Sequence, residues 1–321
     1  MEKITRRTLL AASTIAAGGL LGAGAAGAEP SAAGGAFDAE FRTVAKAAGG
    51  RWHAYVTELG SGERTAVVDQ DADFLIEGAS VQKLAVMAGV LAEVDAGRVR
   101  LTDTTTLDEA SVMEGSGIYL NQAAFGDQLT VASLLTSMLQ VSDNTAVRLL
   151  SRFVSGETIN TNLDKLGFEK TRVEPIPGED RFYLGVTTPR ENNELLYRLA
   201  SGTLLSKSST QAIMRVMTWS GVGYTDGVRR YMSSEERSRF ATKFGAAEDR
   251  RHETGVMLDE NGAPLVVFSF FADQAPDSGN YGGTNPIVAA HAALGRFMID
   301  TYKGLSPLRS YVNPKVIARG H

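Results

Sequence analysis

The sequence predicts an α/β fold in which both ends of the chain build one antiparallel sheet, flanked by helices, with an all-α lobe inserted between them. Strand-like patterns occur near the start and near the end of the 321-residue chain, whereas the long middle segment carries mostly helical patterns. We therefore expect a sheet domain from residues 37–79 and 240–305 and a helical domain from residues 80–239. A cleft between two such units is a common place for a binding site.

The first 28 residues are predicted to be an export signal. Lys3, Arg6 and Arg7 precede an uncharged run that ends in Ala-Gly-Ala, the layout of a cleaved signal peptide. The paired arginines are typical of a twin-arginine signal, which exports folded proteins. A permanent membrane anchor is the alternative, but a run so rich in Gly and Ala makes a poor span. We expect a secreted or periplasmic protein without stable membrane insertion.

Net charge, the absence of cysteine and the spacing of histidines exclude several classes of function. The formal charge is −5, and removing residues 1–28, which carry three basic and one acidic side chain, leaves −7. An acidic protein is a poor candidate for nucleic-acid binding, so we expect a small-molecule substrate and a monomer. The chain has no cysteine, which excludes disulfides, thiolate metal sites and cysteine nucleophiles. Its four histidines lie far apart without metal-ligand spacing, so no metal or cofactor is expected.

The N-terminal part of the mature chain predicts a linker, a helix and a hairpin. Residues 29–36 have the low complexity of a linker, and residues 37–48 show helical periodicity that ends at Gly49-Gly50, a common helix C-terminal signal. Residues 51–59 and 64–69 are strand-like, and the Gly-Ser-Gly-Glu segment between them predicts a β-hairpin.

Helical patterns fill the middle of the chain, and strands return near its end. Residues 240–247, 252–258 and 264–272 are rich in β-forming side chains, and an amphipathic helix follows at residues 286–302. Residues 306–321 are expected to form a C-terminal tail. The helical patterns of the middle segment cover residues 81–96, 131–139, 144–153, 189–200 and 208–219.

Ser80 and Lys83 form the first chemical element. They lie three residues apart at the start of an apolar helical run, so their side chains share one helix face. This spacing suits a serine nucleophile with a lysine base, provided that burial or a nearby cation makes the amine partly neutral. A solvated helix face is the alternative for such a common pair.

Two further elements follow in the chain. Ser142, Asp143 and Asn144 form a polar tripeptide between two helical patterns, where a simple helix cap is the alternative interpretation. Lys243 and Gly245 lie on the first late strand, where an inward lysine beside a small residue could form one wall of the cleft.

Taken together and in this order, these motifs resemble the three signatures of class A β-lactamases and penicillin-binding proteins. The segment 172–175 with the following residues also resembles the omega loop of that family, with Glu174 as its catalytic glutamate. The resemblance covers the mature chain except the last dozen residues. It implies the fold described above and a serine hydrolase that forms an acyl-enzyme.

The resemblance also implies a role for each residue. Ser80 would be the acylated nucleophile, and either Lys83 or Glu174, through a water, would take its proton. Ser142 would pass a proton to the leaving nitrogen. Asn144 would bind Lys83 and the substrate amide.

Substrate binding is implied for the strand and the segment before it. Lys243 would hold Ser142 and attract the substrate carboxylate, and the backbone N–H groups of Ser80 and Ala246, next to Gly245, would form the oxyanion hole. Either Arg229 or Arg230 could reach the same carboxylate, and we expect Arg230 to do so; a solvated surface pair is the alternative.

Two positions depart from the family pattern. Phe244 replaces a hydroxyl residue that binds the substrate carboxylate, and Gly178 stands where the resemblance calls for the asparagine that helps Glu174 to hold the deacylating water. The first departure should weaken substrate binding, and the second should slow deacylation. Glu174 has the alternative interpretation of a surface carboxylate.

We therefore predict a secreted serine hydrolase that opens β-lactam rings. Two alternatives remain open. One is a D-Ala-D-Ala peptidase or small-ester hydrolase that uses the same pair of residues. The other is a β-lactam or peptidoglycan binding protein that does not hydrolyse its ligand.

Overall fold

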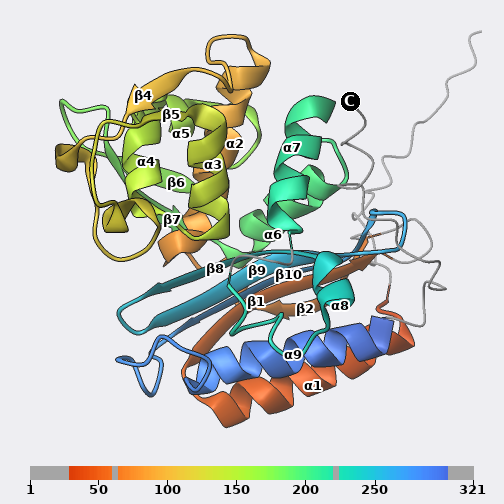
Figure 1. The fold of residues 1–321 in the computed structure, drawn as a ribbon. Helices are drawn as coiled ribbons and strands as arrows, with labels where there is room; N and C mark the ends of the chain where they lie inside the picture. The colour runs from red at the N-terminus through yellow and green to blue at the C-terminus, as the bar shows by residue number, and fades with distance from the viewer. Residues whose placement is uncertain (1–28, 60–63, 220–223, 303–321) are drawn as a thin grey trace, which may run out of the picture.

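The computed structural model describes residues 29–59, 64–219 and 224–302. It confirms the predicted α/β fold, because strands from the two ends of the chain lie side by side in one sheet (Figure 1). The predicted export signal at residues 1–28 and the predicted tail at 306–321 lie outside the described residues, as does the hairpin connection at 60–63.

The central sheet has five antiparallel strands in the order β2-β1-β10-β9-β8. The first strand of the chain pairs with the last one, with Trp52 opposite Ala272. Strands more than 200 residues apart in sequence are therefore neighbours at the centre of the sheet. Strand β8 forms one edge and faces the helical lobe (Figure 1). The strands are β1 (Arg51–Leu59), β2 (Arg64–Gln70), β8 (Phe240–Ala247), β9 (Arg250–Leu258) and β10 (Pro264–Asp273).

Two helices from the chain ends, α1 (Ala32–Ala48) and α9 (Pro286–Tyr302), cover one face of the sheet (Figure 1). Their apolar sides pack on the sheet in an aromatic core, where the rings of Phe41 and Trp52 lie edge to face with their centroids 5.8 Å apart. Helix α1 begins earlier than predicted. Ser31 caps it by accepting a hydrogen bond from the Gly34 N–H, so most of the predicted linker at 29–36 is helical.

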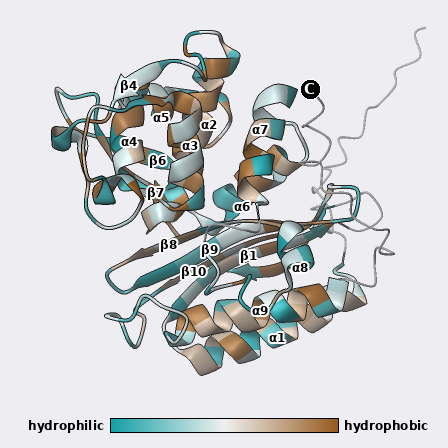
Figure 2. Cartoon of the chain, in the orientation of Figure 1, coloured by the Kyte–Doolittle hydropathy of each residue, from teal (hydrophilic) through white to brown (hydrophobic). Residues whose placement is uncertain are grey.

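The helical lobe covers the other face and surrounds α2 (Lys83–Asp95), which is buried on nearly all sides. Gly89 of α2 lets α5 approach closely, since a Cβ there would lie 2.8 Å from the side chain of Ile159. The neighbouring helices carry both hydrophobic and hydrophilic residues, as expected for helices with one buried face (Figure 2). The lobe helices are α3 (Val131–Gln140), α4 (Asn144–Leu150), α5 (Gly156–Lys165), α6 (Pro189–Ala200) and α7 (Lys207–Met217); the short α8 (Ser234–Ser238) precedes β8.

The structure adds short strands, in this lobe and directly before it, that the sequence did not predict. Strand β3 (Ile76–Glu77) pairs with β7 (Phe182–Thr187), which pairs with β6 (Arg172–Pro175), and β4 (Thr104–Thr106) pairs with β5 (Gln128–Thr130). Within the described residues, no helix combines the length and the apolar character needed to cross a bilayer.

A buried carboxylate joins the two ends of the chain. Glu58 on β1 accepts hydrogen bonds from the Ser31 hydroxyl at 2.8 Å and from the Tyr302 hydroxyl at 3.0 Å. It also accepts one from the Ser31 N–H. The start of α1, the end of α9 and strand β1 of the sheet are therefore joined by one side chain.

We expect Glu58→Ala to lower the free energy of unfolding of the protein without residues 1–28 by about 2–3 kcal/mol, because it removes charge-assisted hydrogen bonds and leaves the buried Tyr302 hydroxyl unpaired. Urea denaturation followed by circular dichroism would measure the change. Glu58→Gln keeps the acceptor oxygen and should lose less. Equal stability of the alanine variant and the parent would contradict this role.

Candidate active site

Ser80 lies in a short 3-10 helix, Ala79–Gln82, that leads directly into α2. The edge strand β8 passes so close to this turn that a Cβ at Gly245 would lie 2.7 Å from the Val81 nitrogen and 3.0 Å from the Ser80 nitrogen. Only glycine permits this approach of two backbones. Gly245 therefore allows β8 to form a wall directly beside the nucleophile, as the sequence predicts for this position.

The Lys83 amine is the centre of a polar cluster. Its Nζ lies 3.1 Å from Ser80 Oγ, 3.0 Å from Ser142 Oγ and 2.7 Å from Asn144 Oδ1. It also donates to the Ser142 carbonyl. The first two sequence motifs are thus brought together at one nitrogen, and Lys83 is fully buried rather than part of a solvated helix face.

Burial shifts the protonation of this lysine. Loss of solvent holds the pKa of Lys83 well below its usual 10.5, and the positive charge of Lys243 lowers this pKa further, whereas Asp143 opposes the shift. An amine with a lowered pKa is neutral in a larger fraction of molecules at neutral pH. It can then accept the proton of Ser80.

Ser142 connects the two lysines. Its Oγ accepts from Lys243 Nζ at 3.1 Å on one side and lies 3.0 Å from Lys83 Nζ on the other. Burial lowers the pKa of Lys243 to about 7, although Glu253 opposes this effect. The three motifs of the sequence therefore form one continuous hydrogen-bonded chain from Ser80 to β8.

The helix-cap interpretation of residues 142–144 is also correct, but for Asp143 alone. Its Oδ1 accepts from the Ala146 N–H at 2.9 Å and caps α4, and its Oδ2 accepts from the Ile118 N–H at 2.7 Å. This buried carboxylate ties the loop before β5 to the motif. Ser142 and Asn144, on either side of it, remain available to Lys83.

Two residues at the site adopt backbone conformations that are unfavourable for side chains other than glycine. Ala79, next to Ser80, has φ 45°, and Ser142 has φ 57°. Each such conformation typically costs about 1–3 kcal/mol, and strained residues of this kind cluster at functional sites. The strain lies at the two points where the chain presents a hydroxyl to Lys83.

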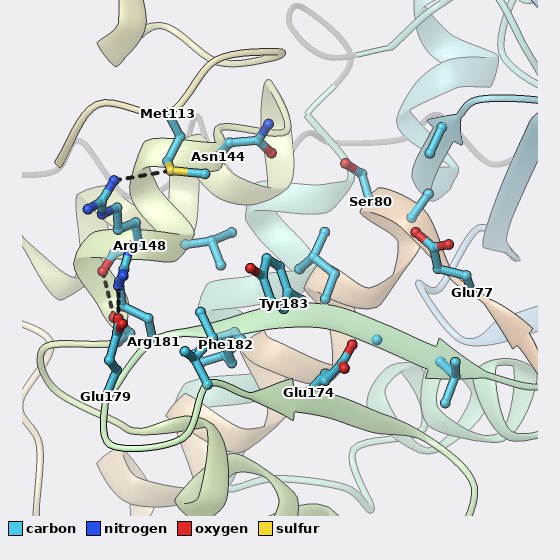
Figure 3. Close-up of a pocket in the computed structure, with 18 of the residues that line it drawn as sticks. Glu77, Ser80, Met113, Asn144, Arg148, Glu174, Glu179, Arg181, Phe182 and Tyr183 are labelled. Atoms are coloured by element: carbon cyan, nitrogen blue, oxygen red, sulfur yellow. Dashed lines mark hydrogen bonds and ion pairs between the residues drawn. The ribbon is translucent and has the colours of Figure 1, made fainter.

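Two cavities meet at Ser80, and Asn144 and Ala246 also line both. One, of about 860 Å³, extends over the β6–β7 hairpin and is called here the hairpin cavity (Figure 3). The other, of about 870 Å³, contains both lysine and arginine side chains and is called the basic cavity. Apolar and aromatic residues of the hairpin cavity include Met113, Val147, Ile176, Phe182, Tyr183 and Leu184, and residues of the basic cavity include Ser142, Trp219, Tyr224, Arg229, Lys243 and Phe244.

Glu174 is not placed as predicted. It lies on strand β6, opposite Tyr183 of β7, so the segment expected to form an omega loop forms a β-hairpin instead. Its carboxylate is exposed and makes no hydrogen bond or ion pair with any described residue, Ser80 and Lys83 included. In the view of Figure 3, Glu174 and Ser80 lie on opposite sides of the β7 ribbon. Glu174 nevertheless lines the hairpin cavity together with Ser80.

The structure separates the two candidate arginines. The Arg230 guanidinium donates to the Gly283 carbonyl and lines neither cavity, so the structure does not bring Arg230 to the site. Arg229 is buried, lines the basic cavity and donates to the Met217 carbonyl at 2.7 Å. Burial lowers the pKa of Arg229 to about 10, which still leaves it charged at neutral pH.

Phe244 lines the basic cavity, where the sequence placed it beside the substrate carboxylate. Its ring stacks on Tyr224, with centroids 3.7 Å apart. Sequence reasoning did not identify Tyr224 or Tyr183, because a lone tyrosine in a loop or short strand carries no pattern that distinguishes it. Within the described residues, no group of three or more His, Asp or Glu side chains could hold a metal ion.

Known proteins resemble this chain over most of its length. The protein-family model described as Beta-lactamase enzyme family matches residues 36–301. A β-lactamase of Rhodobacter capsulatus is 27% identical over 210 residues, which are 64% of this chain and 69% of that protein.

Solved structures share the fold. A β-lactamase from Sphaerobacter thermophilus aligns with a TM-score of 0.66 and 24% identity over 85% of this chain and 98% of that one. A variant of PBP-A, solved as an acyl-enzyme complex with penicillin G, aligns with a TM-score of 0.66 and 17% identity over 84% and 96%.

The lowered pKa of Lys83 predicts a pH dependence that can be measured without knowing the substrate. Above this pKa the amine is neutral and can accept the Ser80 proton, so labelling of Ser80 by a serine-directed phosphonate should rise with pH and reach half its maximum well below pH 10.5. Lys83→Arg keeps a charged group that cannot lose its proton, and should lower the labelling rate by about 100-fold or more. Labelling of this variant at the parent rate would exclude Lys83 as the base.

Proposed function

We propose that this chain, which belongs to the Beta-lactamase enzyme family of serine hydrolases, opens β-lactam rings by transferring the acyl group to Ser80. The observation that carries the proposal is the position of the Lys83 amine within 3.1 Å of both the Ser80 and Ser142 hydroxyls. A nucleophile, its base and a second proton carrier thus lie within hydrogen-bond distance around one buried atom.

Acylation begins when neutral Lys83 takes the Ser80 proton. The oxygen of Ser80 then attacks the lactam carbonyl carbon, and negative charge develops on the carbonyl oxygen. Backbone N–H groups at the Ser80 turn and the facing strand, at Ala246, would stabilise that charge, an effect typically worth a few kcal/mol. The close approach permitted by Gly245 supports this geometry.

Ring opening requires a proton on the leaving nitrogen. Ser142 supplies it as the carbon–nitrogen bond breaks, and Lys83, which holds the proton taken from Ser80, replaces the one that Ser142 has lost. The 3.0 Å separation between Lys83 Nζ and Ser142 Oγ supports this direct transfer. The product is an ester of Ser80 with the ring nitrogen protonated, so that no proton is gained or lost overall.

The two cavities match the two halves of such a substrate. A carboxylate on the leaving-nitrogen side would lie in the basic cavity, near Lys243 and Arg229. The acyl side chain would lie in the hairpin cavity, where apolar and aromatic side chains such as Phe182, Tyr183 and Leu184 could pack against an aromatic or aliphatic group. The substrate class is therefore a small molecule that combines an apolar acyl group with a carboxylate.

Deacylation is where this chain differs from the pattern that it resembles. A hydrolytic water needs a base near the ester, and Glu174 makes no contact with Ser80 or Lys83. This observation favours a second candidate function in which the acyl-enzyme persists and the protein acts as a penicillin-binding protein. PBP-A, whose variant is known as an acyl-enzyme with penicillin G, provides a precedent in the same fold.

We also propose that the protein is exported as a folded monomer. The arginine pair at residues 6 and 7 and the uncharged run that follows support a twin-arginine signal. The chain has no cysteine, so it needs no oxidising compartment to fold before export.

Intact-mass analysis of the protein without residues 1–28, mixed with benzylpenicillin over time, tests the reaction. We expect an adduct of one penicillin in the parent and none in Ser80→Ala, whose fold should be unchanged because one oxygen is removed at a cavity. A transient adduct would support hydrolysis and a lasting adduct the binding function. Absence of any adduct in the folded parent, with the benzylpenicillin left intact, would reject both and favour a peptidase or esterase.

The position of Glu174 predicts that it contributes little. Glu174→Gln should change the decay rate of the adduct by less than about threefold, because the exposed Glu174 carboxylate makes no hydrogen bond that would hold it toward Ser80 or Lys83. Mass spectrometry after removal of free penicillin measures this rate, with Glu179→Gln as the matched exposed control on the same hairpin. A slowing of about 100-fold or more would mean that Glu174 reaches the ester after all.

A further inference from the structure

Glu253 is a fully buried carboxylate that the proposed reaction does not use. It lies on β9 opposite Phe244 of β8, whereas Lys243 pairs with the next residue, Thr254. Because paired residues share a face and neighbours alternate, Glu253 points away from Ser80 toward the layer of α9. Its Oε1 has no hydrogen-bond partner among the described residues. A buried carboxylate with an unpaired oxygen is costly and calls for an explanation.

The other oxygen of Glu253 holds a turn. Its Oε2 accepts from the Val228 N–H at 2.8 Å, and a Cβ at Gly227 would lie only 1.9 Å from it. From the opposite side, Gly295 of α9 approaches so closely that a Cβ there would lie 2.1 Å from the Val228 carbonyl oxygen. The turn at residues 227–229 is therefore packed so tightly between β9 and α9 that neither glycine could carry a Cβ without a shift of the backbone or of Glu253.

This turn carries Arg229 into the basic cavity. Arg229 follows Val228 directly, and its guanidinium donates to the carbonyls of Met217 and Trp219. Its backbone is held by Glu253 through Val228, and its side chain is held by the end of α7. The position of this cation beside the proposed carboxylate site therefore depends on Glu253.

The charged groups near Glu253 belong to the same cavity wall. Arg229 and Lys243 both lower the pKa of Glu253, but burial outweighs them and raises it to about 7. Two other titratable groups face it. His291 of α9, 3.6 Å away, is neutral because burial lowers its pKa to about 3, and burial also raises the pKa of Tyr224, which keeps the phenol neutral.

We propose that Glu253 is a positioning residue that fixes Arg229 and sets the net charge of the basic cavity, so that the protein selects for carboxylate-bearing substrates in a pH-dependent way. This inference rests on the proposed function of Ser80. Below the pKa of Glu253, Arg229 and Lys243 act on the substrate without a counter-charge. As pH rises through about 7, Glu253 becomes a carboxylate that offsets Arg229, and Lys243, whose pKa burial lowers to about 7, loses its charge over the same range. Both changes weaken the attraction for an anionic substrate, and only the first is removed in a variant without the Glu253 carboxyl group.

The test compares acylation of Ser80 by benzylpenicillin with acylation by its methyl ester, using intact mass, from pH 5.5 to 8.5. The ratio of the two rate constants isolates the effect of the substrate carboxylate from the titration of Lys83. At pH 5.5 this ratio should be the same in Glu253→Gln and in the parent, because the amide replaces a neutral acid of the same shape. At pH 8.5 it should be about threefold or more higher in Glu253→Gln, which cannot acquire the opposing charge.

Glu235→Gln, an exposed site on α8, is the matched control for loss of one negative charge and should follow the parent. Glu253→Ala, which also loses the Val228 hydrogen bond, should lower the ratio at pH 5.5, and glutamine should restore it at that pH. If glutamine is not tolerated in the fold, the ratio at pH 5.5 in folded Glu253→Ala still tests the positioning role. A parent-like pH profile in a folded, charge-free variant would overturn this inference alone. No adduct in the parent and no loss of benzylpenicillin would overturn the proposed function and this inference with it.

Discussion

The burial of one amine organises the site. Lys83 sits at the start of a helix that is buried on nearly all sides, so its nitrogen has no access to water and must find partners within the protein. An uncompensated charge there would be very costly, and the protein meets this cost in two ways. It surrounds the nitrogen with oxygen atoms, and it lowers the pKa so that the neutral form is accessible.

The partners of Lys83 come from separate parts of the chain, which explains why the whole fold is needed. Ser80 lies one turn before it, Ser142 and Asn144 come from the junction of α3 and α4, and β8 from the end of the chain closes the site. Asp143 fixes this junction by capping α4 and holding the loop before β5. The strained backbone conformation at Ser142 persists because packed elements hold it on both sides.

The sequence predicted the fold and the three motifs because each depends on local pattern. Strand and helix periodicity survives in the central sheet and in α9, and the spacing of Ser80 and Lys83 follows from helix geometry. Glu174 was misplaced because a strand of four residues depends on its partner β7 and not on its own side chains. The sequence could not predict which of Arg229 and Arg230 reaches the cavity, because the directions of two adjacent side chains in a turn depend on tertiary contacts. Here the decisive contacts are those of Gly283 and Met217.

The two lysines are best understood as one device. They share the Ser142 oxygen, and the charge of Lys243 is one of the causes that lower the pKa of Lys83. A charged Lys243 therefore attracts an anionic substrate and at the same time favours the neutral, proton-accepting form of Lys83. When Lys83 has taken the proton from Ser80, the same repulsion favours its onward transfer to Ser142. The requirement for a base and the requirement for an anion site are therefore met by two lysines whose amines both lie within 3.1 Å of the Ser142 hydroxyl.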